Sequence, residues 1–178
     1  MGRTQGLRND RTPARIATVA GDAIAATRRI VNDLRPRILD VLGLSAALRT
    51  MVDGFATRTG IRCDCQVVDP EGANETLSTE LMDCLYRVTQ ESLNNVFRHA
   101  RASQAHVLLD LSGGQSVLLR ITDNGTGIRS QDLEKPDSVG ILGMDERVNA
   151  LHGRLHVEPV GEGGTLVEAL LPQRPTQA

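Results

Sequence analysis

A polar stripe marks the central helical segment of the chain. Glu91, Asn95 and His99 are spaced four residues apart, and Arg98 stands beside His99, so on a helix these side chains point from one face. A solvated helix face also carries such residues. A carboxylate, an amide and two basic side chains are, however, suited to a metal-bound polyphosphate, because Mg²⁺ prefers oxygen ligands and phosphates. The stripe leaves both interpretations open.

A second polar motif, ITDNGTGI, begins where an apolar strand is expected to end. The strand delivers Asp123 into a turn that contains Gly125 and Gly127. An Asn-Gly pair alone is typical of an ordinary hairpin turn. A carboxylate at the end of an apolar strand is partly buried, however, and needs a hydrogen-bond donor such as the exocyclic amine of adenine. Neighbouring glycines let the backbone approach a flat ring or a phosphate.

A third motif, SVGILGMDERV, contains Gly140 and Gly143, which are expected to precede a helix. The free N–H groups and the dipole of a helix start favour an anion. The motif is neither a phosphate-binding loop ending in GK[ST] nor a dinucleotide-binding GxGxxG. A glycine-rich helix start is weak evidence alone, so its meaning depends on the other two motifs.

The elements that must position these motifs begin with a long helix. Residues 1–11 are polar without periodicity and predict a disordered lead, and Thr12 with Pro13 predicts a helix start. Pro36 is expected to interrupt that helix, and Gly60 to end the next segment. Small and aliphatic residues at heptad spacing favour packing within the domain, against another helix or against a second copy of the chain. They are Ile16, Ala20, Ala23, Thr27, Ile30, Leu34 and Val41.

The remaining elements alternate between strands and helices. Their order predicts an α/β (α+β) fold with a mixed sheet that is covered on one face by helices. The expected elements are a strand at 61–68, a helix from Ser78 to about Ala100, a hairpin of 105–111 and 116–123, a helix around 142–151 stopped by Gly153, and closing strands at 154–160 and 165–172.

Composition narrows the classes of function. The 178 residues suffice for one domain with an appended helix. A net charge of −2 and 2% aromatic residues argue against a nucleic-acid partner. We expect no membrane segment and no signal peptide in this chain. Cys63 and Cys65 fall on one face of a strand and predict structural cysteines in the reducing cytoplasm, although a longer parent protein could be membrane-anchored.

The motifs also carry a family resemblance. QESLNNVFRHA resembles the N-box of the GHKL ATPase superfamily, while DNGTGI and GILGMDERV resemble its two glycine boxes. LRPRILDVLGLSAAL and LYRVTQESLNNVFRHA resemble more narrowly the nitrate-sensor and desaturase-sensor type of histidine kinase. The resemblance covers about residues 28–172 and implies a Bergerat-type two-layer sandwich. It also implies a dimerisation-hairpin helix at 12–43, an ATP-binding catalytic domain at 44–172 and a tail at 173–178.

The resemblance implies a role for each matching residue. Asn95 matches the Mg²⁺-coordinating asparagine, Glu91 the acid that orients or polarises the site, and Asp123 the aspartate that binds the adenine amine. Arg98 and His99 match a basic pair near the phosphates. The other matches are Gly125 and Gly127 in the adenine pocket, Gly140, Leu142 and Gly143 at the hinge and wall of an ATP lid at 128–139, and Thr165, which supports the aspartate through water.

The chain departs from the family pattern in two places. Ser138 stands where many relatives have glycine, and no histidine precedes His99, although the subfamily carries its phosphoacceptor histidine on the first hairpin helix. We therefore expect a fragment of a longer kinase, or a domain that uses ATP and Mg²⁺ to phosphorylate an acceptor hairpin of another chain, which then serves a response regulator.

Other members of the superfamily offer alternatives. An ATP-hydrolysing module uses the same pocket, but the chain lacks a long transducer segment with a lysine that reaches the γ-phosphate, since Lys135 lies in the expected lid. A nucleotide-binding regulatory module is disfavoured by the intact Glu91, Asn95 and Asp123. The hairpin motif disfavours a serine-kinase anti-sigma factor.

Overall fold

The computed structural model describes residues 37–70, 72–128, 139–161 and 163–173. The expected lead at 1–11, most of the expected helix at 12–43 and residues 129–138 of the expected lid lie outside these ranges. Within them, a single mixed sheet has the strand order β1-β2-β3-β5-β4, with β1 parallel to β2 and the other pairs antiparallel. The strands are β1 (Arg62–Val68), β2 (Gln104–Asp110), β3 (Ser116–Asp123), β4 (Arg154–Pro159) and β5 (Thr165–Pro172).

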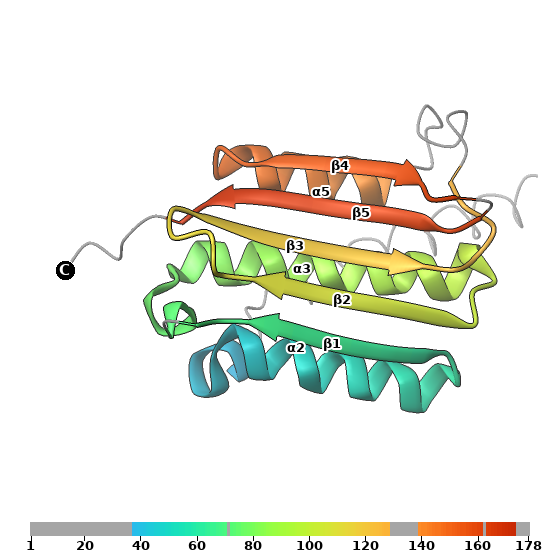
Figure 1. Cartoon of the computed structure of the whole chain (residues 1–178), viewed down its shortest axis with the longest axis horizontal. Helices are drawn as coiled ribbons and strands as arrows, with labels where there is room; N and C mark the ends of the chain where they lie inside the picture. The colour runs from blue at the N-terminus through green and yellow to red at the C-terminus, as the bar shows by residue number, and fades with distance from the viewer. Residues whose placement is uncertain (1–36, 71, 129–138, 162, 174–178) are drawn as a thin grey trace, which may run out of the picture. The chain divides into compact units, whose positions relative to one another are not determined.

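Three described helices, α2 (Arg37–Thr59), α3 (Thr79–Asn95) and α5 (Val139–Ala150), lie on one face of this sheet (Figure 1). The strand side chains that point toward them form the core. These include the buried Val107, Leu119, Ile121, Ala169 and Leu171. The predicted mixed sheet with helices on one face is therefore confirmed, as is the predicted order of elements.

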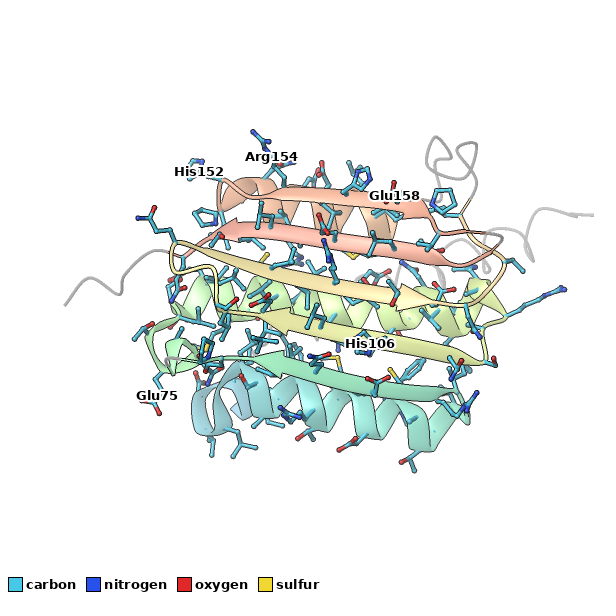
Figure 2. All side chains as sticks on the ribbon, viewed as in Figure 1. Glu75, His106, His152, Arg154 and Glu158 are labelled. Atoms are coloured by element: carbon cyan, nitrogen blue, oxygen red, sulfur yellow. The ribbon has the colours of Figure 1, made fainter. Side chains whose placement is uncertain are left out.

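The opposite face of the sheet carries charged and polar side chains beside several leucines, of which Leu170 is 44% exposed. Arg120 Nε on β3 lies 2.5 Å from Glu168 Oε2 on β5, and His106 Nδ1 lies 2.6 Å from Asp64 Oδ2. Figure 2 shows His106 and Glu158 on this face, which no described element covers. Buried and partly exposed positions alternate along β2 and β3, as one-sided burial requires.

Helix α3 begins where the sequence predicts. The Ser78 hydroxyl accepts a hydrogen bond from the Leu81 amide at 3.2 Å and caps the first turn. The last turn differs from the expectation, because residues Val96–Ala100 form a π-helix, η2. Arg101, which ends this turn, has the left-handed conformation with φ 52°. The predicted apolar positions Leu81, Leu85, Val88, Leu93 and Val96 are all buried.

The described part of helix α2 starts at Arg37. The helix ends before Gly60, whose φ of 74° and hydrogen bond to the Ala56 carbonyl stop it as predicted. An internal break at Gly43, with φ 72° and ψ 174°, was not predicted. After the break, Asn74 of the short 3₁₀ helix η1 (Ala73–Thr76) accepts hydrogen bonds from the Ser45 amide and hydroxyl. Thus a distant side chain caps the second part of α2.

The three cysteines are free thiols on the core side of the molecule. Cys63 and Cys65 share the inner face of β1, as expected. Burial raises the pKa of Cys63 to about 11 and that of Cys84 to about 12, so these thiols are protonated at neutral pH. None of the described helices combines the length and the apolar character that crossing a membrane requires.

Candidate functional site

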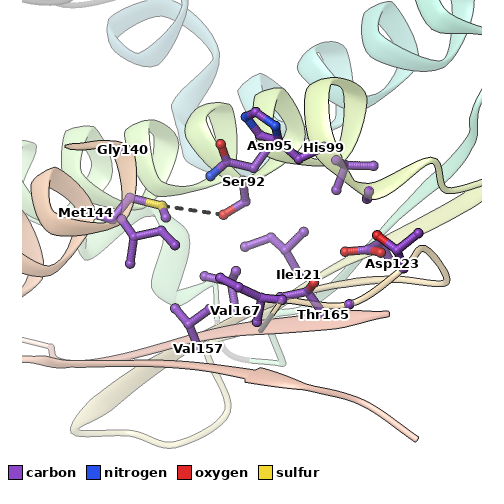
Figure 3. Close-up of a pocket in the computed structure, with 16 residues that line it drawn as sticks. Ser92, Asn95, His99, Ile121, Asp123, Gly140, Met144, Val157, Thr165 and Val167 are labelled. Atoms are coloured by element: carbon purple, nitrogen blue, oxygen red, sulfur yellow. Dashed lines mark hydrogen bonds between the residues drawn. The ribbon is translucent and has the colours of Figure 1, made fainter. Parts of the chain in front are cut away.

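A cavity of about 440 Å³ lies between α3, α5 and the inner face of the sheet (Figure 3). This volume is within the ordinary range for small-molecule sites. Most of the exposed surface inside it is apolar. Its apolar side chains are Val96, Ala100, Ile121, Ile128, Ile141, Met144, Val157 and Val167, and its polar side chains are Ser92, Asn95, His99, Asp123, Thr126 and Thr165.

Asp123 presents a fixed carboxylate to this cavity. It is the last residue of β3, and its Oδ1 accepts a hydrogen bond of 2.7 Å from the Gly125 amide. The backbone N–H and the hydroxyl of Thr165, at the start of β5, lie beside it. Burial raises the pKa of Asp123, and the Gly125 and Thr165 donors oppose that shift. The group is thus a half-buried acceptor held by two neighbouring segments.

Two glycines after Asp123 are required by close backbone contacts. A Cβ atom on Gly125 would overlap the carbonyl oxygen of Ala100. Gly127 has a φ of 74°, and a Cβ there would lie 2.9 Å from the Gly164 carbonyl oxygen, so a side chain is excluded by conformation and by space. Gly127 lines the cavity, whereas Gly125 does not.

The polar stripe of α3 supplies the other polar groups of the cavity. Asn95 is the last residue of α3 and His99 lies on the π-helical turn, and both side chains line the cavity from the helix side (Figure 3). Arg98 is exposed and does not line the cavity. Glu91 is half-buried and does not line it either, but its carboxylate touches Gly140 at the start of α5.

Helix α5 starts earlier than expected. It begins at Val139, so Gly140 and Gly143 lie inside its first turns instead of preceding it, and this expectation was wrong. Glycine disfavours a helix interior by about 1 kcal/mol. Packing of Ile141, Met144 and Val148 against the core outweighs that cost. Of the expected lid-wall residues that the structure describes, Gly140 lines the cavity, whereas Gly143 does not and Leu142 is exposed.

The structure therefore brings together six of the expected site residues: Asn95, His99, Asp123, Gly127, Gly140 and Thr165. It also adds residues that the sequence reasoning missed. Ser92 lines the cavity, and its hydroxyl lies 3.6 Å from the Met144 sulfur. Its position three residues before Asn95 on the same helix could have revealed it. Val157 and Val167 are cross-strand partners on β4 and β5, which no local signal links.

The cavity fits an adenine nucleotide by its own chemistry. Apolar walls suit a flat ring, the Asp123 carboxylate suits an amine hydrogen, and Asn95 with His99 suits the polar part of the ligand. Among the described residues, no group of three or more His, Cys, Asp or Glu side chains could hold a metal ion.

Comparison with known proteins agrees with this geometry. Residues 82–175 match the family model described as "Histidine kinase-, DNA gyrase B-, and HSP90-like ATPase". The match contains the polar stripe, the Asp123 turn and the start of α5.

Curated relatives extend the similarity toward the N-terminus. The sensor histidine kinase MctS of Rhizobium johnstonii is 39% identical over 153 residues, which cover 85% of this chain and 32% of MctS. The sensor histidine kinase LiaS of Bacillus subtilis is 33% identical over 172 residues, covering 95% of this chain and 46% of LiaS. The chain thus spans less than half the length of these relatives.

Solved structures share the fold. The histidine kinase domain of the Erythrobacter litoralis EL346 blue-light activated histidine kinase matches with a TM-score of 0.58 at 22% identity, over 74% of this chain and 61% of that chain. The mycobacterial sensor histidine kinase MprB matches with a TM-score of 0.55 at 19% identity, over 76% of this chain and 99% of that chain.

Proposed function

Because this chain belongs to the family of histidine kinase-, DNA gyrase B- and HSP90-like ATPases, we propose that the cavity beneath α3 binds Mg-ATP for transfer of its γ-phosphoryl group to a histidine. The chain carries the ATP-binding catalytic domain of a two-component sensor histidine kinase. The roles of individual residues, the binding of Mg²⁺ and the source of the acceptor histidine are proposals.

The observation that supports adenine recognition is the half-buried Asp123 carboxylate. Three donors hold it in place at the edge of an otherwise mostly apolar cavity. A buried carboxylate with an unfilled lone pair is costly, and an adenine amine would fill it. Guanine carries a carbonyl oxygen at the corresponding ring position, so it would repel the carboxylate. The site should therefore prefer ATP to GTP.

Asn95, His99, Arg98 and Glu91 would serve the phosphate end. Phosphoryl transfer depends mainly on positioning and charge neutralisation. Asn95 would supply a neutral oxygen ligand to Mg²⁺, and Arg98 and His99 would offset phosphate charge. Glu91 would orient or polarise the reacting groups. The bond from the γ-phosphorus to the bridging oxygen breaks, a bond to an imidazole nitrogen forms, and ADP leaves.

The acceptor imidazole would come from a hairpin helix bearing a histidine followed by an acid, because no histidine precedes His99 in this chain. From that histidine the phosphoryl group would pass to an aspartate of a response regulator. Residues 12–43 would supply a helix of the hairpin and a homodimer contact. A cytoplasmic location, where ATP is available, remains a prediction.

Thermal unfolding with added nucleotide tests the central proposal. Ligand that binds only the folded state raises its stability by RT ln(1 + [L]/Kd). Millimolar Mg-ATP and ADP should raise the melting temperature, and GTP should raise it less. Asp123→Asn should remove most of the difference between ATP and GTP. Equal shifts with ATP and GTP in the wild type would contradict the role of Asp123.

A further inference from the structure

Glu91 and Gly140 meet where α3 crosses the start of α5. A Cβ atom on Gly140 would overlap Oε1 of Glu91 and would lie 3.1 Å from its Cδ atom and 3.4 Å from its Cγ atom. The Glu91 carboxylate thus occupies the space that any side chain at position 140 would need. The crowded group is the far end of a flexible side chain, so an added methyl group would displace the carboxylate more easily than the helix.

A second contact fixes the two helices in register. Ser92, the next residue of α3, donates its hydroxyl to the sulfur of Met144, one turn after Gly140 on α5. Both Ser92 and Met144 are 2% exposed. Moving α5 away from Glu91 to accommodate a larger residue at position 140 would break this buried contact.

We propose that Gly140 is a positioning residue for Glu91: its missing side chain leaves the space that the Glu91 carboxylate occupies at the start of α5. This inference rests on the proposed function, in which Glu91 acts on the reacting groups. It gives Gly140 a steric role inside a helix, distinct from the hinge role that a glycine-rich segment suggests. The start of α5 then controls where the carboxylate points.

Gly143 offers a matched comparison on the same helix. No heavy atom lies within 4 Å of a Cβ atom built there, so Gly143→Ala adds a methyl group without a collision. Alanine favours a helix interior over glycine, so Gly143→Ala should raise the melting temperature by about 2 to 4 °C. Gly140→Ala gains the same helix propensity but must displace Glu91, so its melting temperature should rise less or fall.

The spectroscopic readout is the ¹³C chemical shift of the Glu91 side-chain carboxyl carbon. Gly140→Ala should change this chemical shift, because the carboxylate is displaced. Gly143→Ala should leave the chemical shift unchanged. In a Glu91→Ala background the overlap is gone, so Gly140→Ala should then stabilise the protein as much as Gly143→Ala does. Neither readout requires any kinase activity.

The functional readout separates rate from binding. With a supplied acceptor hairpin and saturating Mg-ATP, Gly140→Ala should lower the rate of phosphohistidine formation about 10- to 100-fold, while the Kd for Mg-ATP should change less than about threefold. In the Glu91→Ala background, Gly140→Ala should cause no further loss of rate. An equal loss in both backgrounds, or an unchanged Glu91 carboxyl signal, would overturn the proposal. Absence of phosphotransfer by the wild type would instead count against the proposed function.

Discussion

Thr165 places its backbone N–H and its hydroxyl beside the Asp123 carboxylate, where both groups lower the pKa of that carboxyl. The contact joins the end of β3 to the start of β5, which are neighbours in the sheet. An acceptor held from both sides is ready for a ligand without reorganisation, which lowers the cost of binding.

Removing the Thr165 hydroxyl should weaken adenine binding. Thr165→Val keeps the shape of the side chain but removes one donor to Asp123, and a hydrogen bond to a charged group contributes about 1.5 to 3 kcal/mol. Partial compensation by solvent is expected at this half-buried position, so the Kd for ATP should rise roughly 3- to 10-fold. Calorimetric titration measures it. Thr165→Ser retains the hydroxyl and should bind nearly as the wild type, and equal weakening in both variants would contradict the role of the hydroxyl.

Adenosine binding should depend on pH through Asp123. Burial raises the pKa of this carboxyl above its ordinary value of 3.8, so it takes up a proton at a higher pH than an exposed aspartate does. Since the ionised form accepts the adenine amine hydrogen, affinity should be full above the raised pKa and should fall as the pH drops through it, approaching tenfold per pH unit. Adenosine avoids titration of phosphate groups. Asp123→Asn should bind weakly with a flat pH profile, and a flat wild-type profile would contradict the prediction.

Asn95→Ala should separate phosphate binding from adenine binding. The variant loses the side-chain oxygen proposed for Mg²⁺ but leaves Asp123 and the apolar walls unchanged. Its affinity for adenosine should match the wild type, while the gain in ATP affinity that Mg²⁺ confers should shrink by about tenfold. Titrations of ATP with and without Mg²⁺ measure this gain. A variant that kept the full gain would show that the metal has no ligand at Asn95.

The capping contact between Asn74 and Ser45 should contribute to stability. The Asn74 Oδ1 accepts bonds of 3.0 Å and 2.9 Å from the Ser45 amide and hydroxyl, just after the break at Gly43. Asn74→Ala should lower the free energy of unfolding by about 1 to 2 kcal/mol, as loss of a helix cap does. Asn149→Ala removes an exposed contact to Asp145 within α5. This variant should change the free energy of unfolding by less than about 0.5 kcal/mol. Equal effects would contradict a special role for Asn74.

Sequence reasoning succeeded where the signal is local. The hairpin of β2 and β3 and the helix start at Ser78 depend on nearby residues, and the structure confirms both. The spacing of Asn95 and His99 also sufficed to place both at one cavity. The π-helical turn after Asn95 did not break this alignment, because the two residues remain about one turn apart.

The features that were missed depend on contacts between distant segments. The break at Gly43 accompanies a cap from Asn74, which is 29 residues away from Ser45. The early start of α5 depends on packing of its apolar residues, which outweighs the poor helix propensity of two glycines. A single sequence does not show which distant residues come into contact, so these features required the structure.

Phosphotransfer in trans is the prediction that decides between a kinase and a bare nucleotide binder. Incubated alone with labelled ATP, this chain should form no acid-labile, base-stable phosphohistidine. His99 lines the nucleotide cavity on the helix side, where it is suited to contact phosphates and not to receive in-line transfer, and His106 points to the opposite face of the sheet (Figure 2). Supplied with a hairpin that bears a histidine followed by an acid, the chain should phosphorylate that histidine.

The rate should be low and should rise with hairpin concentration, because two separate molecules must meet and the entropy advantage of one assembly is absent. Fusing the hairpin ahead of residue 12 should raise the rate at equal concentration. Glu91→Ala and Asn95→Ala should each suppress the reaction, whereas Asn149→Ala, on the exposed side of α5, should not. Strong labelling of the isolated chain would refute the requirement for an external acceptor. Tight Mg-ATP binding without transfer to any matched hairpin would instead assign the domain to nucleotide binding alone.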